Sequence, residues 1–388
     1  MPLKLNRRAR WAVPGTAVAV TAGVIAAFQI PAAQASPNLP AKTPAQLLAS
    51  LSNDKKVPPM TGTVVETANL GLPQLPTQAS NPTSMTSLLT GSHTVKVYYQ
   101  DATHYRLAIP QPQAETDVIA NGGKTWLWES AGNSVTEFLP PAGKTTAPAP
   151  NPVQTPLTPQ QAANQILAKV GKTTAVSDQA NVMVAGEPSY QLVLAPKDSR
   201  SLVGKVVIAL DGKYGVPLRV QLYAKGASSP AFQVGYNNLQ WVSPASSNFS
   251  FTPPHGASVK LVQLGTGHAK SASGAAPAAS GVGTYGKSWL TVVSFPQADL
   301  SKGFGTGSGS TSSASQQNAY SAGSKGVGVS SQELLNGLLG SAKPVHGSWG
   351  SGTLVTTSLV SMLMTGGQVY VGAVTPSVLY AAVGHTTS

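Results

Sequence analysis

Short runs of alternating apolar and polar residues, separated by glycine and proline, most limit what this chain can fold into. The clearest run is Leu-Arg-Val-Gln-Leu at residues 218–222, where every second side chain is apolar. Successive side chains of a strand point to opposite faces, so this run has one buried and one solvated face. With 39 glycines and 31 prolines, short strands joined by turns are favoured over a helical bundle. We therefore expect an antiparallel sheet that is covered on one face.

Similar runs predict strands along much of the chain. Up to residue 241 they lie at residues 61–69, 94–99, 104–109, 116–120, 124–129, 134–138, 181–185, 189–195, 205–210, 218–223 and 232–241. Residues 121–123, Asn-Gly-Gly, and 131–133, Ala-Gly-Asn, are suited to hairpin turns between such strands. Further strands are predicted at residues 288–295, 354–364 and 368–374, the last two joined by a turn at residues 365–367.

Capping motifs predict the helices. Thr43 and Thr158 each precede a proline and lie three residues before a glutamine, which is a capping box with proline in the first turn. Ser330 with Glu333 makes a further box, and Thr375 before a proline opens a short final helix. The apolar faces of the first two helices carry Leu47, Leu48, Leu51, Ile166, Leu167 and Val170.

Low-complexity stretches divide the chain into parts. Residues 265–281 form an Ala/Ser/Gly linker, and residues 301–328 form a Gly/Ser-rich insertion that we expect to be mobile. We therefore expect a first domain over residues 36–264 and a small α+β domain over residues 282–388. At 388 residues the chain is long enough for two hydrophobic cores.

The N-terminus has the pattern of an export signal. Four basic residues within the first ten precede the uncharged residues 11–30, and Ala33-Gln34-Ala35 forms an A-x-A site for a signal peptidase. Residues 1–35 are expected to be a cleaved signal peptide. An uncleaved N-terminal anchor is the alternative, because about 20 apolar residues can cross a bilayer. Either reading places the protein outside the cytoplasm, secreted or tethered to the outer face of the plasma membrane.

The composition narrows the class of partner. There is no cysteine, which excludes disulfides and thiolate chemistry. The 25 basic and 13 acidic residues give a net charge of +12. The basic residues are scattered and form no stripe with aromatic residues, so nucleic-acid binding is not expected. Attraction to anionic lipids, and hence peripheral membrane association, fits this charge better.

The sequence contains no recognisable catalytic motif. The six histidines lack metal-ligand spacing, and there is no Gly-x-Ser-x-Gly elbow. Glu115 and Asp117 share one strand face and could form a carboxylate pair for glycoside hydrolysis. Two acids at this spacing are more typical of a solvated strand edge. We therefore expect a non-enzymatic protein without metal or cofactor.

Apolar side chains offer a candidate binding site instead. Trp126 and Trp128 lie two residues apart, so both rings face the same side of a strand. With Val95, Val97 and Tyr99 on a neighbouring strand they could line a concave pocket; ordinary core packing is the alternative. The two helices, expected to act as lids, complete the candidate lining with Leu47, Leu51, Ile166 and Leu167.

Residues 248–259, Asn-Phe-Ser-Phe-Thr-Pro-Pro-His-Gly-Ala-Ser-Val, end a predicted strand in a distinctive way. Phe249 and Phe251 would lie on one side of this strand, which must stop at the two prolines. The ending resembles the closing strand of the LolA lipoprotein-carrier superfamily. The Asn-Gly-Gly-Lys-Thr-Trp-Leu-Trp hairpin at residues 121–128 and the order of elements over residues 43–260 are similar as well. The resemblance implies an α+β fold in which helices cover a curved antiparallel half-barrel with a site for lipid chains.

Residues 288–293, 355–364 and 369–376 carry a second resemblance, to the smaller domain of RseB/MucB proteins. It implies a periplasmic regulator that restrains proteolysis of a membrane anti-sigma factor. This sequence departs from the lipoprotein carriers in one respect. The carriers bear an arginine at the cavity mouth, whereas the comparable residues here, 100–103, are Gln-Asp-Ala-Thr, and the nearest arginine is Arg106. We expect binding of lipid or lipoprotein acyl chains in an apolar cavity or, alternatively, binding of such an anti-sigma factor.

Overall fold

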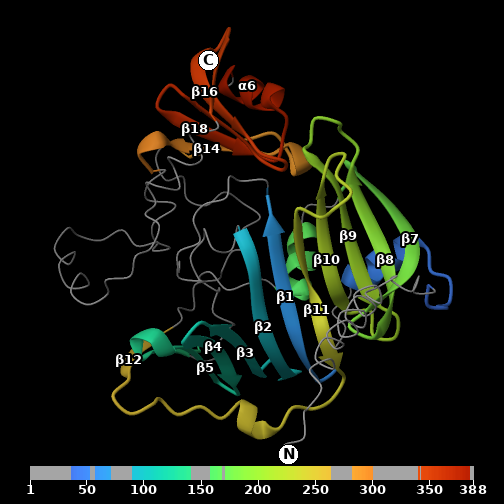
Figure 1. Cartoon of the computed structure of the whole chain (residues 1–388), viewed down its shortest axis with the longest axis vertical. Helices are drawn as coiled ribbons and strands as arrows, with labels where there is room; N and C mark the ends of the chain where they lie inside the picture. Colours follow the sequence, from blue (N-terminus) through green and yellow to red (C-terminus); the bar gives the residue numbers. More distant parts are fainter. Residues whose placement is uncertain are drawn as a thin grey trace, which may run out of the picture. The chain divides into compact units, whose positions relative to one another are not determined.

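The computed structural model describes residues 36–52, 57–70, 90–140, 158–167, 171–263, 282–299, 340 and 342–384. The expected signal segment with Ala33 and Ala35, the helix at Ser330, the linker and the insertion 301–328 lie outside these ranges. The described chain is mostly β, with a large, predominantly antiparallel sheet and a smaller second sheet (Figure 1). The antiparallel sheets are therefore confirmed, whereas helix forms a smaller share than an α+β class implies.

The large sheet has twelve strands in the order β12-β6-β5-β4-β3-β2-β1-β11-β10-β9-β8-β7. They are β1 (Met60–Asn69), β2 (Thr90–Asp101), β3 (His104–Gln111), β4 (Ala114–Asn121), β5 (Lys124–Glu129), β6 (Ser134–Leu139), β7 (Thr174–Val184), β8 (Glu187–Pro196), β9 (Val203–Asp211), β10 (Pro217–Ala224), β11 (Phe232–Gln240) and β12 (Ser258–Gln263). Strands β1 to β6 form one antiparallel meander and β7 to β11 another, joined where β1 pairs with β11. At one edge, β12 runs parallel to β6. All strands predicted up to residue 241 are observed, with β7 starting earlier than expected.

Strand register divides the large sheet into two faces. Residues that pair directly across antiparallel strands point to the same face. The pairs that lead from Val95 to Val64, and through β11 to Val220 and Ile208, therefore define one face, which we call the inner face. These four residues are 0–2% exposed and belong to one core cluster. The opposite face, here called the outer face, carries Arg106 among others.

Two short helices, α1 (Pro44–Ser52) and α3 (Pro159–Leu167), contact each other and strands β7, β8, β10 and β11. Both begin with the predicted capping box. The Thr43 N–H donates to Gln46 Oε1 at 2.8 Å, and the Gln46 N–H donates to Thr43 Oγ1 at 3.2 Å. The same two bonds join Thr158 and Gln161 at 2.9 and 3.3 Å. They satisfy amides that have no partner within the helix, so both helices begin where the sequence predicts.

The segment between β11 and β12 is not the strand that its Phe-Thr-Pro-Pro pattern predicted. A 3-10 turn, η3 (Ser246–Asn248), precedes Phe249, whose backbone is helical at φ −100° and ψ −12°. The reason is topological, because β11 lies within the sheet and β12 lies beyond β6, so this segment crosses the strands between them. Phe249 is 4% exposed, and the Phe251 ring packs on Trp126 and Trp128. The Phe249 ring lies against His104 of β3, so both phenylalanines pack on the sheet although they do not belong to a strand.

The small sheet has six strands in the order β13-β14-β18-β17-β16-β15. They are β13 (Gly283–Tyr285), β14 (Val292–Pro296), β15 (Lys343–Gly347), β16 (Gly350–Thr356), β17 (Ser361–Thr365) and β18 (Gln368–Gly372). Helix α6 (Pro376–Gly384) packs on this sheet and begins at the predicted position. Gly366 and Gly367, with φ of +55° and +73°, form the tight turn between β17 and β18, as expected for a hairpin.

Two predicted strands of the small sheet are wrong in their bounds. Residues 288–290 form a 3-10 turn, η4 (Ser288–Leu290), instead of the start of β14. The strand predicted over residues 354–364 is divided between β16 and β17. Leu359 lies in the break, is 3% exposed and belongs to the core cluster of the large sheet. Alternation could not reveal this break, since it does not say which sheet an apolar residue contacts.

Backbone hydrogen bonds join the two sheets. The Leu202 N–H donates to Ala373 O at 2.9 Å, and the Thr375 N–H donates to Arg200 O at 2.8 Å. An isolated antiparallel bridge lies between these two bonds. The two sheets therefore share a backbone connection and, through Leu359, an apolar core.

Candidate ligand-binding face

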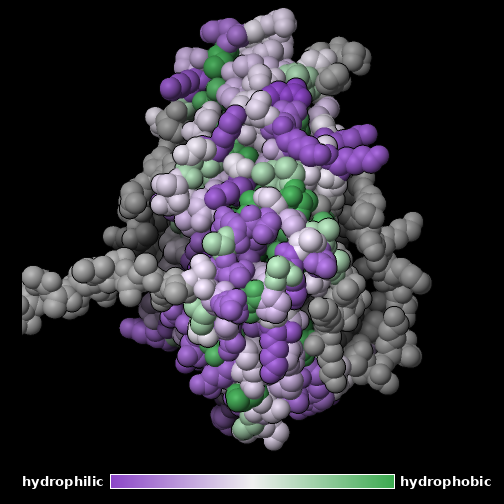
Figure 2. Space-filling model, turned by 90° about the vertical axis from the view of Figure 1, so that its right-hand side faces the viewer, coloured by the Kyte–Doolittle hydropathy of each residue, from purple (hydrophilic) through white to green (hydrophobic). Residues whose placement is uncertain are grey.

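The inner face of the large sheet carries a continuous set of apolar side chains from β2 across to β8. Its members at 0–3% exposure include Val64, Val95, Val97, Leu192, Ile208, Val220 and Val234. On the molecular surface shown in Figure 2, by contrast, hydrophobic residues are scattered among hydrophilic ones. Each buried side chain of this size contributes roughly 1.5–3 kcal/mol. The inner face therefore needs a cover that excludes water.

Helices α1 and α3 cover part of this face, over strands β7, β8, β10 and β11. Leu47 and Leu51 of α1 are 2% and 7% exposed, and Ala162 and Ala163 of α3 are 4% and 0% exposed. All four belong to the core cluster of the inner face. Among the described contacts, no hydrogen bond or ion pair joins a side chain of α3 to the sheet; the Gln160–Asn164 bond, at 3.0 Å, is internal to the helix. Apolar packing therefore holds α3 on the strands.

Seven of the nine residues predicted to line a cavity meet on this face. Leu47, Leu51, Val95 and Val97 lie in the core cluster, and Tyr99, Ile166 and Leu167 are half-buried against it. Alternation along β2 and the apolar spacing of the two helices identified these residues. Their meeting depends on the fold, because α1, β2 and α3 are far apart in the sequence.

The two tryptophans, Trp126 and Trp128, lie on the other face. Trp126 pairs with Ile119 of β4, which in turn pairs with Arg106 of β3. Trp126, and with it Trp128 two residues on, therefore lies on the outer face with Arg106. There they form a separate small core with Phe251. The expected adjacency of their strand to β2 is wrong, because β3 and β4 lie between β5 and β2. Alternation within one strand does not specify which strand pairs with it.

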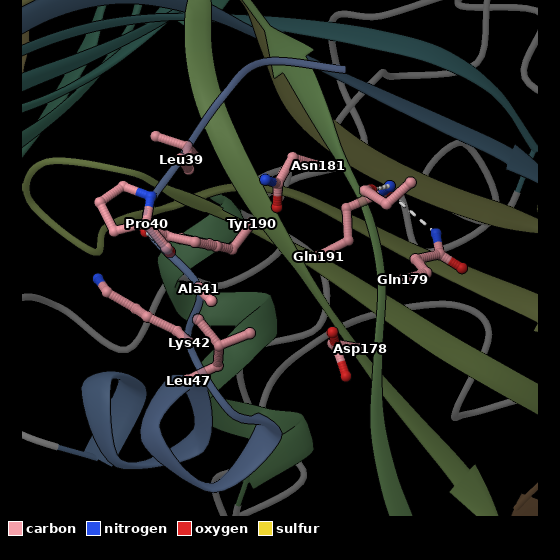
Figure 3. A pocket seen from close by; sticks show the side chains of 11 residues that line it. Leu39, Pro40, Ala41, Lys42, Leu47, Asp178, Gln179, Asn181, Tyr190 and Gln191 are labelled. Carbon is pink, nitrogen blue, oxygen red and sulfur yellow. Dashed lines mark hydrogen bonds between the residues drawn. The ribbon is translucent and has the colours of Figure 1, made fainter.

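A pocket of about 410 Å³ opens at one end of the inner face, between residues 39–42, α1 and strands β7 and β8 (Figure 3). Its floor is apolar, since Leu47 and Tyr190, 2% and 4% exposed, line it and also belong to the inner-face core. Its polar rim includes Lys42, Asp178, Gln179 and Asn181. The volume lies in the range of small-molecule sites, about 300–1,000 Å³. The pocket is thus amphipathic.

One wall of the pocket is the extended segment that precedes α1. The Tyr190 hydroxyl donates to Pro40 O at 2.7 Å, and Asn181 Nδ2 donates to Pro37 O at 3.2 Å. The Lys42 ammonium lies 4.5 Å from the centre of the Tyr190 ring, a distance typical of a cation–π contact. These three contacts hold the segment against β7 and β8.

The opposite wall contains a bulge in the edge strand β7. The β7–β8 register shifts between Gln179 and Val182. Gln179 Nε2 donates to Gln191 Oε1 at 3.0 Å, and Gln191 Nε2 donates to Ala180 O at 2.5 Å, so side chains support the irregular backbone. Of the pocket residues, sequence reasoning found only Leu47. A bulge depends on the partner strand and leaves no signal in one strand's alternation.

A charge cluster with one buried member, Asp117, lies on the outer face, next to Trp128. Arg106 Nη2 donates to Asp117 Oδ2 at 2.5 Å and to Glu115 Oε1 at 3.1 Å. The Asp117 side chain is 1% exposed and that of Glu115 is 38% exposed. Burial, and then the hydrogen bond with Glu115, raises the pKa of Asp117 to about 7 against the opposing effect of Arg106. The solvated strand edge expected for these two acids is therefore wrong for Asp117.

The described residues contain neither a candidate metal centre nor a candidate membrane-spanning helix. Within those ranges, no group of three or more histidine, aspartate or glutamate side chains is placed to hold a metal ion. Over the same residues, no helix is both long and apolar enough to cross a bilayer. The described residues instead provide buried apolar side chains on the inner face and polar side chains at the pocket rim.

Fold and site together define a mostly β protein with a large, predominantly antiparallel sheet, a smaller second sheet, and two short helices packed on part of an apolar sheet face. No family model and no curated protein matches the chain. Among solved structures, MucB in complex with MucA(peri) is 12% identical with a TM-score of 0.39, covering 88% of this chain and 96% of that chain. The Pseudomonas aeruginosa MucA/MucB complex gives 12% and 0.38, covering 88% and 95%. A LolA-superfamily protein from Nitrosomonas europaea gives 12% and 0.21, covering 54% and 99%.

The structural neighbours thus include both groups of proteins that the sequence resembles, LolA-like and MucB-like. Their TM-scores lie below 0.5 and their identities near one residue in eight. At such values, the geometry of this chain itself has to support any function.

Proposed function

We propose that this chain is a non-enzymatic, extracytoplasmic protein that binds lipid or lipoprotein acyl chains between the inner face and helices α1 and α3. The observation that carries the proposal is an apolar sheet face covered by a helix, α3, that has no described polar side-chain bond to the strands. In this proposal the large sheet is a curved half-barrel and the helices are its lid. Residues 36–264 would form this binding domain, and residues 282–388 a second one.

An acyl chain can replace the contacts of α3 at little cost. Moving α3 away would expose apolar side chains, and a bound chain would bury them again at about 0.8 kcal/mol per methylene. Over the described residues, no side-chain hydrogen bond from α3 to the strands would have to break. The proposed lining comprises Leu47, Leu51, Val95, Val97, Tyr99, Ile166 and Leu167. The N-terminal export pattern and the net charge of +12 support a site near an anionic membrane surface.

A matched pair of tyrosines tests the proposal. Tyr98 and Tyr99 are adjacent in β2 and both half-buried, but Tyr99 points to the inner face and Tyr98 to the outer face. Native mass spectrometry after organic extraction, and titration with a fluorescent fatty acid, measure ligand binding. Tyr99→Ser should weaken fatty-acid binding about tenfold, because an apolar contact is lost, whereas Tyr98→Ser should leave it unchanged. A purified protein without bound lipid or fatty-acid uptake would refute acyl-chain binding.

A regulatory role is the second candidate, in which the small sheet binds a membrane anti-sigma factor. It is favoured by exposed apolar side chains at one edge of that sheet, since Val282 is 45% and Val293 39% exposed. Val293→Asp should abolish capture of an anti-sigma factor's extracytoplasmic segment. Val259→Asp is the matched control, because Val259 is 47% exposed on β12 of the large sheet. Equal capture by both variants would exclude this surface.

A further inference from the structure

We propose that the pocket beside α1 binds a zwitterionic headgroup, with an ammonium and an anionic group on the same ligand. This inference rests on the proposed acyl-chain binding and adds to it the polar end of the ligand. Leu47 and Tyr190 connect the two sites, because both line the pocket and both belong to the inner-face core. An amphiphile whose chain lies on the inner face would therefore place its polar end at the pocket rim.

The β7 wall of the pocket offers hydrogen-bond acceptors. Asp178 contributes a carboxylate, and Asn181 lies nearby on the same strand (Figure 3). One of the two N–H groups of Asn181 Nδ2 donates to Pro37 O at 3.2 Å, and no described hydrogen bond occupies the amide oxygen, which can accept from a ligand. A carboxylate and an amide oxygen together suit a donor with several N–H bonds, such as a primary ammonium.

The opposite wall offers a cation. Lys42 comes from the segment before α1 and is held over the Tyr190 ring at 4.5 Å. Within the described part of the chain, neither Lys42 nor Asp178 takes part in an ion pair. Two opposite charges on different walls of one pocket are thus available to a ligand that carries both signs (Figure 3).

The ligand class follows from this arrangement. A phosphoethanolamine-type group has an ammonium with three N–H donors and a phosphate for Lys42. A choline group has the charge but no N–H donor, and a phosphoglycerol group has no cation. The pocket should therefore favour phosphoethanolamine over both. The same chemistry occurs in a lipid headgroup and in a free, chain-less zwitterion, so the experiment has to separate these sources.

The test uses the full-length chain and three lysophospholipids with the same acyl chain, carrying ethanolamine, choline or glycerol. Each displaces a bound fluorescent fatty acid in a competition titration. The ethanolamine lipid should bind at least about fivefold more tightly than the choline and glycerol lipids, as expected for a charged hydrogen bond. Asp178→Asn should remove this preference, and Lys42→Gln should weaken binding of all three about fivefold. Lys205→Gln is the matched control, because Lys205 also lies over a tyrosine ring, at 4.8 Å, outside the pocket.

The outcomes separate this inference from the proposed function. Equal binding of the three lysolipids by wild type, with fatty-acid uptake intact, overturns the headgroup site but keeps acyl-chain binding. Calorimetry with glycerophosphoethanolamine, which has no acyl chain, probes the pocket alone. If glycerophosphoethanolamine binds as tightly as the lysolipid, and this binding depends on Asp178, the ligand of the pocket is a free zwitterion and not a lipid headgroup. If neither ligand binds wild type and fatty-acid uptake is absent as well, both proposals fail.

Discussion

Asp117 shows, at the scale of a residue, how the sheet changes the chemistry of a side chain. In the sequence it is one of two acids spaced two apart, which is typical of a solvated edge. In the fold its strand β4 lies between β3 and β5, and its carboxyl group is buried. A single guanidinium, that of Arg106, contacts both Asp117 and Glu115. Because burial disfavours the charged form, and one guanidinium cannot neutralise two carboxylates, the buried acid tends to keep its proton.

We predict that Asp117 makes the folded chain more stable at pH 5 than at pH 8. Its pKa is raised from 3.8 to about 7 on folding, so the folded state binds a proton that the unfolded state has released. This stabilisation is complete below about pH 4 and is lost as the pH rises through 7. Asp117→Asn should reduce the difference in the free energy of unfolding between pH 4 and pH 8 by roughly 1–3 kcal/mol. Urea titrations at each pH measure it.

The control for this prediction is Glu129→Gln, which changes an exposed carboxylate on the neighbouring strand β5 and should leave the pH profile unaltered. Asp101 does not interfere in this window, because the Thr103 hydroxyl bond lowers its pKa to about 2. A variant Asp117→Asn with the wild-type slope would show that Asp117 is ionised in the folded state.

In the proposed function, helix α3 is the element that has to move for a ligand to reach the inner face. It lies on β10 and β11 through apolar packing, so we predict that it opens without unfolding of the sheet. The chain has no cysteine, so single Ala→Cys variants report exposure through thiol labelling. Labelling should be fastest for Ala49→Cys, which is exposed on α1. It should be slower for Ala163→Cys, on the buried face of α3, and slowest for Ala209→Cys, in β9. Equal rates at positions 163 and 209 would mean that α3 moves only on global unfolding.

The capping box of α3 should control how often the helix opens. Thr158→Ala removes the hydroxyl that accepts from the Gln161 N–H at 3.3 Å, at a cost of about 1 kcal/mol to the helix. Labelling of Ala163→Cys should then become roughly fivefold faster. Thr158→Ser keeps the hydroxyl and serves as the control. No acceleration in the alanine variant would indicate that packing alone fixes this end of α3.

At the scale of the whole molecule, Leu359 couples the two sheets. It lies between β16 and β17 of the small sheet but is buried in the core of the large one. Thr357 Oγ1 accepts from the Leu359 and Val360 N–H groups at 3.3 and 3.0 Å, which shapes the loop that presents this side chain. The small sheet therefore contributes a side chain, Leu359, to the hydrophobic core of the large sheet.

We predict that Leu359→Ala destabilises the protein by about 2–4 kcal/mol, the usual cost of a cavity at a buried leucine. Because the lost contact joins two sheets, urea unfolding should also separate into two transitions. Leu261→Ala, at a residue that is 63% exposed on β12, is the control and should change neither. A single transition at the wild-type midpoint would contradict a coupling role for Leu359.

Capping boxes and apolar alternation predicted the helices and strands, because each of these patterns depends only on residues within one short segment. The boxes at Thr43 and Thr158 fixed the starts of two helices, and alternation located β1 to β6 and β8 to β11. Alternation also placed Val95, Val97 and Tyr99 together on one face. The same reasoning failed at Phe249 and Leu359, where the chain crosses a sheet or reaches into another one.

The sequence by itself determined antiparallel strands, the capped starts of two short helices, an apolar strand face and an export pattern, but it predicted an α+β class where the described chain is mostly β. Only the tertiary structure decided that the tryptophans lie on the opposite face from the helices, that Asp117 is buried beside Arg106, and that Lys42 and Asp178 border one pocket. The physical reason is that periodicity follows from the local backbone, whereas strand pairing, bulges and crossings depend on contacts between distant segments.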